Sequence, residues 1–357
     1  MNKLSEDMPS HFRMPAEWEP QECLWFSWPT ATHLWPGKLD RVQREILRIA
    51  ALVSETSRVG INGLAPGNER TNALLSMVPG LHREALHLSG IPNNDAWCRD
   101  HGPSFVQDRR SGSLAGLDWN FNAWGNKYQP WSLDNQVASR MLESLGVERI
   151  ASPFVGEGGG LEVDGAGTVL LTESVWLNPN RNAGIDKRRI ESWLLEHLGC
   201  QQALWFSEGL AEDDTDGHVD MFARFVKPET MVVCTESNAR HPQYRALQSI
   251  REQLQGFRTL TGGHFDGIDL PMPEPVINDG EACPATYGNF LIYNEWVFVP
   301  QYGQPRNDAH AMGVLGECFP DHRLEAVDCR DLITEGGAIH CLTQQQPVNP
   351  SHSTHLQ

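Results

Sequence analysis

The chain of 357 residues predicts an α/β fold made of repeated small mixed units within a single domain, residues 1–357. Two or three strand-like runs accompany each helical segment, whereas a doubly wound parallel sheet alternates one strand with one helix. A Glu-Gly-Gly-small-aliphatic pattern occurs at residues 157–161 and again at 335–339, which indicates weak internal repetition. No linker rich in Pro, Gly and Ser interrupts the middle of the chain, and segments 1–12 and 348–357 are expected to be peripheral tails.

Hydrophobic periodicity predicts the individual elements. Apolar residues recur every three or four positions, as in helices with one buried face, at Val42–Val53, Leu133–Leu145 and Ile190–Leu198, and a fourth helix is predicted over 243–254. Gly146 and Gly199 follow the second and third stripes, where glycine commonly ends a helix. Runs of β-favouring residues predict strands at Arg58–Ile61, Ala85–Leu88, Pro103–Val106, Thr168–Leu171, Met231–Cys234, Phe290–Tyr293 and Val297–Pro300.

Composition narrows the class of protein. The formal charge of −18 disfavours binding to nucleic acid, because such a surface repels phosphates. No run of about 18 apolar residues occurs, so no membrane span is predicted, and the first residues lack the apolar run of a secretory signal, which predicts a cytoplasmic protein. The eight cysteines form neither CxxC pairs nor a zinc-ligand spacing, which favours reduced thiols.

Cys341 stands in the most informative segment of the chain. It follows the Gly336–Gly337 pair, which lets backbone approach a ligand closely, and it precedes the polar run Gln344–Gln346. If Ile339–Leu342 is an extended strand, His340 and Cys341 point to opposite faces, so a histidine that activates the thiol must come from elsewhere. A buried structural cysteine is the competing interpretation.

His218 is the best candidate for that distant histidine. It follows Gly217 and precedes Asp220 by two positions, so the two side chains share a face if the segment is extended. The acidic run Asp213–Asp216 makes a surface loop the competing interpretation. A metal site is disfavoured, because no second HxH or HExxH element accompanies the pair.

Two other segments place charges beside glycines. Residues 94–103 bring Trp97, Arg99 and Asp100 together before a Gly-Pro turn, as at the rim of a pocket, and Glu157 precedes three glycines. Taken singly, these features are compatible with a surface ion pair and an ordinary turn. The carboxylates of these segments together indicate a cationic substrate.

Taken together, these segments resemble the agmatine deiminase family of the guanidine-modifying superfamily. The resemblance implies an α/β-propeller (pentein) of five ββαβ-type units around a pseudo-fivefold axis. It implies hydrolysis of agmatine to N-carbamoylputrescine and ammonia, with no metal or organic cofactor. The matching segments follow one another in the family's order, at 14–20, 25–29, 94–103, 118–125, 157–167, 177–182, 217–220, 299–301 and 337–347.

The resemblance also implies a role for each candidate catalytic residue. Cys341 corresponds to the nucleophile, which forms a thiouronium intermediate, and His218 corresponds to the general acid and base. Asp100 and Asp220 correspond to the carboxylates that hold the guanidinium, and Glu157 to the glutamate that orients the histidine. These carboxylates are expected to raise the pKa of the thiol, so a bell-shaped pH dependence of turnover is expected.

Four further residues are expected to bind the substrate. By resemblance, Trp97 forms an aromatic wall of the pocket and Asn289 corresponds to an active-site asparagine, while Gly337 permits close approach of the backbone. Asp214 departs from the family, which has a glutamate among its substrate contacts at this position. The shorter side chain could alter the reach of the pocket toward the far end of the substrate.

Other activities use the same residues. A deiminase of free arginine or peptidyl-arginine would share the catalytic group, and an amidinotransferase would pass the amidino group from the same thiol to an amine. A binding propeller without catalysis is the alternative from another class of protein. Trp-rich segments near the start, if exposed, predict packing against a second copy in a homodimer or higher oligomer.

Overall fold

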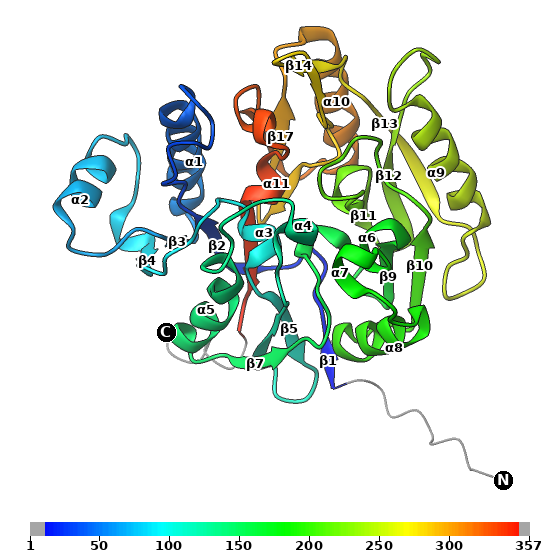
Figure 1. The fold of residues 1–357 in the computed structure, drawn as a ribbon, viewed down its shortest axis with the longest axis horizontal. Coiled ribbons are helices and arrows are strands. Elements are labelled where there is room, and N and C mark those ends of the chain that lie inside the picture. The colour runs from blue at the N-terminus through cyan, green and yellow to red at the C-terminus, as the bar shows by residue number, and fades with distance from the viewer. Residues whose placement is uncertain (1–10, 350–357) are drawn as a thin grey trace.

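The computed structural model describes residues 11–349. These residues form five mixed sheets of three or four strands and one separate two-stranded sheet (Figure 1). In spatial order their strands are β19 (Thr343–Pro347), β2 (Gln21–Ser27), β3 (Arg58–Asn62) and β4 (Leu86–Leu88); β1 (Phe12–Arg13), β5 (Ser104–Asp108), β6 (Leu114–Asp118) and β7 (Glu148–Ala151); β10 (Gln202–Phe206), β9 (Thr168–Thr172) and β8 (Leu161–Val163); β11 (Ala223–Lys227), β12 (Thr230–Thr235) and β13 (Asp266–Pro271); β16 (Leu291–Tyr293), β17 (Trp296–Gln301) and β18 (Arg323–Asp328); and the pair β14 (Val276–Asn278) and β15 (Glu281–Cys283). The predicted mixed α/β class is confirmed.

The five larger sheets repeat one connection pattern. In each, one strand pairs antiparallel with one neighbour and parallel with another; these strands are β2, β6, β9, β12 and β17. The parallel neighbour always follows a helix, namely α1 (Leu39–Ser54), α5 (Val137–Leu145), α8 (Lys187–Leu198), α9 (Tyr244–Gly256) or α10 (Pro305–Cys318). Because β19 is the antiparallel neighbour of β2, a strand near the end of the described chain pairs with one near its start.

The arrangement of helices separates the outside of the molecule from its middle. The five connecting helices lie along the outside, as does the short helix α2 (Glu69–Ser76), whereas the other short helices lie further in (Figure 1). These other short helices are α3 (Cys98–His101), α4 (Ala123–Asn126), α6 (Glu173–Trp176), α7 (Pro179–Asn182) and α11 (Ile339–Leu342). Among them α3, α4 and α11 lie near the middle, and α3 contacts α11, so segments from opposite ends of the chain meet there.

The connecting helices follow from their apolar stripes. Every position of the stripe predicted for α1 is buried. Gly146 and Gly199 follow α5 and α8 with φ of 63° and 67°, the left-handed conformation that glycine adopts without strain. The sequence does not predict α10, because it contains two glycines and buries only Asp308, Ala311 and Leu315. None of the helices within residues 11–349 has the length and apolar character needed to cross a bilayer.

The seven predicted strands are all present, with ends that differ by at most two residues from those predicted. The helix predicted from Leu133 begins instead at Val137, because residues 134–136 form a separate 3₁₀ turn. Local patterns therefore locate most of the elements, whereas their pairing into sheets depends on contacts between distant segments.

The Trp-rich segments near the start of the chain are not exposed, contrary to the prediction. Trp25, Trp28 and Trp35 are all buried within this subunit, because Trp28 and Trp35 belong to the same hydrophobic cluster as the buried face of α1, and Trp25 to a smaller cluster that includes residues of α5. They offer no surface to a second copy of the chain. Assembly into a homodimer or higher oligomer stays a prediction without this support.

The predicted tails lie partly outside the described residues, which exclude 1–10 and 350–357. Where the structure describes them, they are paired. Phe12 is the register partner of Asp108 in the pairing of β1 with β5. The Val348 N–H donates to Pro20 O at 3.1 Å. The described ends of the chain therefore belong to the folded body.

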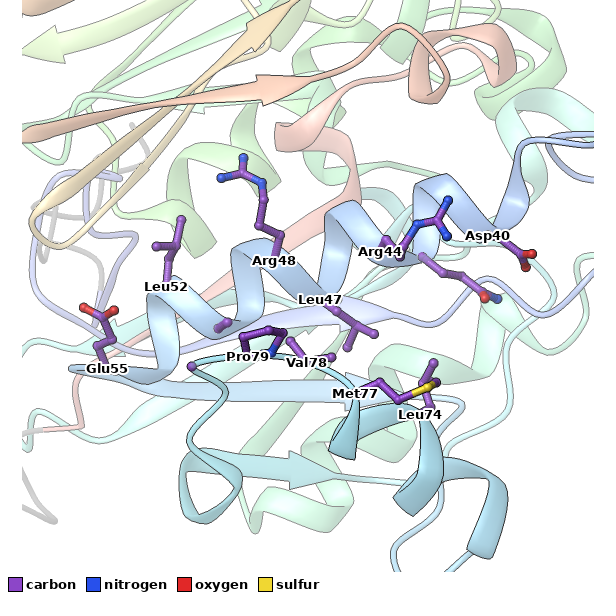
Figure 2. Close-up of a pocket in the computed structure, with 13 residues that line it drawn as sticks. Asp40, Arg44, Leu47, Arg48, Leu52, Glu55, Leu74, Met77, Val78 and Pro79 are labelled. Carbon is purple, nitrogen blue, oxygen red and sulfur yellow. The ribbon is translucent and has the colours of Figure 1, made fainter.

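A groove of about 760 Å³ lies between α1 and the segment that follows α2 (Figure 2). Its apolar lining comes from Leu47, Leu52, Leu74, Met77 and Val78, and charged side chains of α1 form its rim. None of the predicted site residues lines it. The groove is therefore separate from the chemistry that the sequence predicts.

Candidate active site

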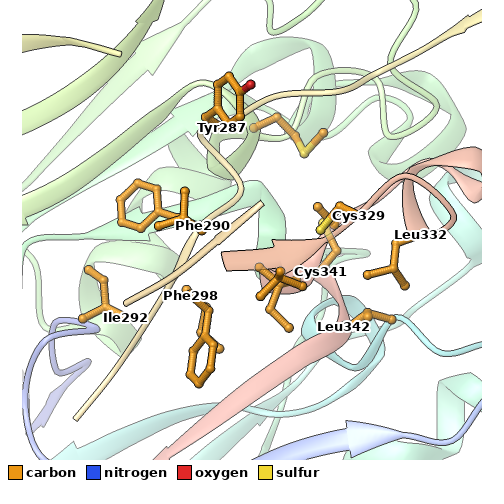
Figure 3. Close-up of a cluster of buried hydrophobic side chains, with 14 of the residues drawn as sticks. Tyr287, Phe290, Ile292, Phe298, Cys329, Leu332, Cys341 and Leu342 are labelled. Carbon is orange, nitrogen blue, oxygen red and sulfur yellow. The ribbon is translucent and has the colours of Figure 1, made fainter. Parts of the chain in front are cut away.

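Cys341 lies on α11 in a nearly closed environment. Its exposed fraction is 5 %, and it borders the buried hydrophobic cluster drawn in Figure 3. Asn289 Nδ2 lies 3.1 Å from Cys341 Sγ, and Asp220 Oδ2 lies 3.8 Å from the same sulfur. The Cys341 N–H donates to Asn289 Oδ1 at 3.4 Å. The thiol therefore has one amide donor and one carboxylate beside it in otherwise apolar surroundings.

The prediction that Ile339–Leu342 is an extended strand is wrong. Gly336 turns the chain with φ of 96°, and the apolar run then forms the single helical turn α11. The strand is formed by the polar residues that follow, because the backbone of Thr343–Pro347 pairs with β2 and buries the glutamines. His340 still does not act on the thiol, since both of its ring nitrogens contact carboxylates.

His218 and Asp220 flank Val219 at the start of a 3₁₀ turn, so the predicted extended segment is also wrong. Gly217 precedes the turn with φ of 107°, a conformation that L side chains rarely adopt. Both side chains are completely buried. The turn, rather than a two-residue strand repeat, directs them into the same region.

Two carboxylates lie on opposite sides of the His218 ring. Asp100 Oδ1 is 3.8 Å from His218 Nδ1, and Glu157 Oε2 is 3.6 Å from His218 Nε2. Arg181 Nε donates to both oxygens of Glu157, at 2.8 and 3.0 Å, and so fixes that carboxylate. Asp100 Oδ1 accepts from the Gly159 N–H at 2.9 Å. The imidazole is therefore held between two carboxylates that have their own partners.

Gly159 lies where these side chains meet. A β-carbon built on it would lie 2.5 Å from His218 Nδ1, 3.0 Å from Asp100 Oδ1 and 3.1 Å from Asp220 Oδ2. Real β-carbons essentially never come within 3.0 Å of such atoms. The glycine after Glu157 and Gly158 therefore leaves the space in which two carboxylates and an imidazole converge.

Trp97 and Gly337 border the thiol. A β-carbon on Gly337 would lie 2.5 Å from Trp97 Cζ3 and 3.1 Å from Cys341 Cβ, so the indole touches the backbone beside the cysteine. Trp97 also packs against Trp35, with ring centroids 5.5 Å apart. The aromatic side chain is thereby fixed from two sides, which is the setting expected for a rigid pocket wall.

A chain of contacts leads from Asp100 to the exposed Asp214. Trp124 Nε1 donates to Asp100 Oδ2 at 3.0 Å, and the Trp124 ring lies 5.7 Å from the Tyr128 ring between centroids. The Tyr128 hydroxyl then donates to Asp214 Oδ2 at 2.8 Å. The same oxygen would lie 3.6 Å from a β-carbon on Gly336. Asp214 is therefore at the rim of the site, not among its buried groups.

The buried carboxylates differ in how well their charge is compensated. Burial raises the pKa of Asp100. Burial also opposes ionisation of Glu157, but Arg181 and His218 together outweigh it and lower the pKa of that carboxyl. Burial also opposes ionisation of Asp220. Other interactions, chiefly the hydrogen bond from His340, outweigh burial and lower the pKa of Asp220. Glu157 and Asp220 are therefore held ionised by a cation on their outer side.

The histidine is protonated, as in a thiolate–imidazolium ion pair, but the thiol is not ionised. Burial opposes a charge on His218, but Asp100, Glu157 and Asp220 outweigh it and raise the pKa of His218 to about 9. Burial raises the pKa of Cys341 well above its usual value, and Asp220 and Asp100 raise it further. This direction agrees with the prediction. At neutral pH the substrate-free site therefore contains an imidazolium and a neutral thiol.

The structure brings eight of the nine predicted site residues into this one region, with Asp214 at its rim. Those eight are Cys341, His218, Asp100, Asp220, Glu157, Trp97, Asn289 and Gly337. Within residues 11–349, no group of three or more His, Cys, Asp or Glu side chains has an arrangement that could hold a metal ion. A sulfur, two flanking carboxylates and a proton donor around one point suit a flat cation that is attacked by the sulfur.

Several residues of this region are not identified from the sequence. Trp124 and Arg181 fall within the segments 118–125 and 177–182, so the resemblance marks their neighbourhood without giving them a role. Gly159 follows Glu157 in a motif that is also compatible with an ordinary turn. Arg224, which lies beneath the site, has no sequence signal, because it is one arginine in a mostly apolar strand that ends at Lys227.

A sequence model of the Porphyromonas-type peptidyl-arginine deiminase family matches residues 13–347. The chain belongs to this family. All of the site residues described above lie within the matched range.

Proteins and solved structures that are similar to this chain include several named as agmatine deiminases. The agmatine deiminase of Ectopseudomonas mendocina is 35% identical over 94% of this chain and 96% of its own. The structure of an agmatine deiminase of Enterococcus faecalis has a TM-score of 0.86 at 32% identity, covering 97% of this chain and 99% of that one. A cysteine-to-serine variant of the C. jejuni agmatine deiminase, with substrate bound, has a TM-score of 0.84 at 30% identity, covering 95% and 97%.

Proposed function

We propose that the protein hydrolyses the guanidinium group of agmatine to give ammonia and N-carbamoylputrescine, through a covalent intermediate on Cys341. The convergence of the thiol, Asp100, Asp220 and His218 around Gly159 carries this proposal. That convergence supports the reaction class. Agmatine as the substrate is supported by relatives at 35% and 32% identity that are named for it.

The proposal includes the architecture expected of such enzymes. The five larger sheets are interpreted as the blades of a five-bladed, pseudo-symmetric α/β-propeller (a pentein) of ββαβ-type units. The repeated antiparallel and parallel pairing supports this interpretation, as does the outer position of the five connecting helices (Figure 1). The site would then lie near the axis, where α3 and α11 meet.

The two carboxylates are assigned to binding of the guanidinium. Asp220 Oδ2 accepts from Asn289 Nδ2 at 3.2 Å, whereas Asp220 Oδ1 is buried without a hydrogen-bond partner among the described residues. A guanidinium N–H would satisfy that oxygen, and Asp100 would accept from the other side. Such charge-assisted bonds hold the planar cation with its central carbon facing the sulfur. Asn289 thus positions both Asp220 and the thiol.

Cys341 and His218 are assigned to the bond-making steps. Once the guanidinium is bound, the Cys341 thiol releases its proton to solvent, and the thiolate attacks the guanidinium carbon and forms a C–S bond. His218 donates its proton to a terminal nitrogen as the C–N bond breaks and ammonia leaves. The resulting S-alkylthiouronium is attacked by water, whose proton passes to His218. The C–S bond then breaks, its electron pair returns to sulfur, the hydroxyl proton is released, and a ureido product remains. Glu157, fixed by Arg181, orients the imidazole for both proton transfers.

The far end of the substrate is assigned to an acidic rim made of Asp214, Glu335 and Asp95. Burial and the charge of Glu335 raise the pKa of Asp95 to about 7, and burial, with a smaller contribution from Asp214, raises the pKa of Glu335, so the three carboxyls interact electrostatically. Tyr128 orients Asp214 by its hydrogen bond. This rim attracts the ammonium of agmatine and repels the α-carboxylate of free arginine.

Access to the sulfur favours a small substrate over a polypeptide. Cys341 is 5 % exposed and Trp97 is 4 % exposed, so the reactive carbon of a substrate must enter a nearly closed space. An agmatine molecule carries its guanidinium on a thin flexible chain that fits such access. Trp97 and the Gly337 backbone are accordingly assigned to the walls around that chain.

The substrate assignment predicts a pattern across substrates and one variant. Ammonia release from agmatine is expected to exceed that from free arginine or a blocked peptidyl-arginine. In Asp214→Asn, KM for agmatine is expected to rise about 3- to 5-fold, as for an exposed ion pair, with little change in kcat. For an alkylguanidine without an amino group the variant should match the unmodified enzyme. Steady-state kinetics with Asp321→Asn as an exposed control checks both, and reaction of the peptide alone would contradict the assignment.

The protonation states predict the pH dependence. Attack needs a thiolate and an imidazolium together, and in the free enzyme the thiol has the higher pKa. Therefore kcat/KM is expected to rise with pH until His218 begins to lose its proton near the value of about 9. The optimum of kcat should lie at lower pH, because the bound guanidinium cation lowers the pKa of Cys341. Initial rates from about pH 5 to 10 measure both; a flat profile contradicts the roles of both residues.

A further inference from the structure

His340, the residue before the nucleophile, lies between two buried carboxylates. His340 Nδ1 is 2.7 Å from Asp220 Oδ2, and His340 Nε2 is 2.7 Å from Glu17 Oε2. Both carboxylates and the ring are nearly inaccessible to solvent. The mechanism described above uses Asp220 but assigns nothing to His340 or Glu17.

The two hydrogen bonds determine the protonation of the ring. A neutral imidazole has a single N–H, so it can donate to only one of two ionised carboxylates. Glu17 behaves as an ionised acceptor, because its Oε1 accepts from the Ile292 N–H at 2.7 Å and Arg224 Nη2 lies 2.9 Å from its Oε2. Asp220 accepts from Asn289 as well as from His340. Both nitrogens of His340 therefore donate, and the ring is an imidazolium.

The charges beneath the site agree with this protonation state. The groups that face one another there are three carboxylates, two arginines and one histidine, namely Glu17, Glu162, Asp220, Arg99, Arg224 and His340. Glu162 accepts from Arg224 Nε at 3.1 Å and from the Phe225 N–H at 2.9 Å, which favours its ionised form although burial raises its pKa. A neutral His340 would leave one buried negative charge uncompensated, which is costly in a low-dielectric interior.

We propose that His340 is a positioning residue: its imidazolium, anchored by Glu17, fixes Asp220 so that Oδ1 remains free to bind the guanidinium. Asp220 Oδ2 is occupied by His340 and Asn289, whereas Oδ1 has no partner among residues 11–349. The imidazolium also keeps Asp220 ionised when the pH falls, because it stabilises the charged form. The inference depends on the proposed deimination for its kinetic consequences but not for the charge of the ring.

The kinetic test is His340→Asn, which keeps one donor and removes the charge. KM for agmatine is expected to rise about 10- to 100-fold, the loss typical of a charge-assisted hydrogen bond, with a smaller change in kcat. Since the cation lowers the pKa of Asp220, its loss raises that pKa. The fall of kcat/KM toward acid pH should then steepen, because both Asp220 and Cys341 must lose a proton.

A matched control separates positioning from general stability. His241 is also buried and also uses both ring nitrogens, toward Pro273 O and the Gln243 N–H, but it lies in the segment before α9. His241→Asn should lower thermal stability while leaving KM and the pH profile unchanged. If His340→Asn also lowers only thermal stability, the positioning role is overturned.

The charge of the ring is tested on the substrate-free protein. Nitrogen-15 NMR of labelled histidine, with His340 assigned from the signals missing in His340→Asn, is expected to show both ring nitrogens protonated at neutral pH. A neutral tautomer at pH 7 overturns the inference even if agmatine is the substrate. A charged ring in an enzyme that does not act on agmatine would overturn the proposed function and leave the ring's charge confirmed.

Discussion

Cys341→Ser is expected to abolish turnover of agmatine while leaving its binding measurable. Serine keeps the size of the side chain, so Asp100, Asp220 and Trp97 still surround the guanidinium, but a hydroxyl in this acidic setting does not ionise to attack it. By analogy with other nucleophile replacements, kcat should fall on the order of 10⁴-fold or more. Calorimetric titration with agmatine and an ammonia assay measure the two effects.

The control for this change is Cys283→Ser, at a partly exposed cysteine of β15 that contacts none of the catalytic residues. It should retain full activity. Mass spectrometry of the unmodified enzyme, quenched with acid during turnover, should locate the thiouronium on the peptide that contains Cys341. Hydrolysis that persists in Cys341→Ser, or an adduct on another cysteine, would remove the residue from the mechanism.

Gly159→Ala is expected to inactivate the enzyme although the change replaces no titratable group. The added methyl would lie 2.5 Å from His218 Nδ1, so the imidazole or the carboxylates beside it must move. A displacement of about 1 Å in a catalytic group commonly costs about 100-fold in rate. Overpacking of this kind also destabilises a fold by about 1–3 kcal/mol. Measurements of kcat/KM and of thermal unfolding check the two consequences.

The neighbouring glycine supplies the control. A β-carbon on Gly160 would come no closer than 3.4 Å, to Val175 Cγ1, so Gly160→Ala should change kcat/KM only a few-fold. The two variants differ by one position and are otherwise the same change. Equal activities in the two would mean that the space at Gly159 is not needed by His218, Asp100 and Asp220.

Much of the fold is predictable because its signals are local. The buried stripe of α1 and the glycines that end α5 and α8 depend on spacing within one segment, and the structure confirms them. The pairing of β19 with β2 is not predictable in this way, because it joins residues more than 300 positions apart whose strand is rich in glutamine. The helical turn of α11 is missed for a related reason: a short run in which three of four residues are apolar favours a strand until its contacts are known.

The site is predictable to a different extent. Family resemblance identifies Cys341, His218 and Asp220 and thereby predicts which distant segments meet, but it gives no geometry. An extended His-x-Asp segment is the natural assumption from spacing, whereas the 3₁₀ turn after Gly217 depends on the surrounding fold. The ion-pair network beneath Asp220 cannot be predicted from the sequence, because Arg224 and its partners come together only after folding.

The pairing of β19 with β2 has a consequence for the order in which the site is assembled during synthesis. Asp100, Glu157, His218 and Asp220 all leave the ribosome before Cys341, which lies eight residues before the last described position, 349. A growing chain can therefore gather its carboxylates and imidazole while it still lacks the reactive sulfur. The strand that follows Cys341 also pairs with β2, near the first of the described residues. The reactive sulfur and the strand that completes this sheet are thus added together during synthesis.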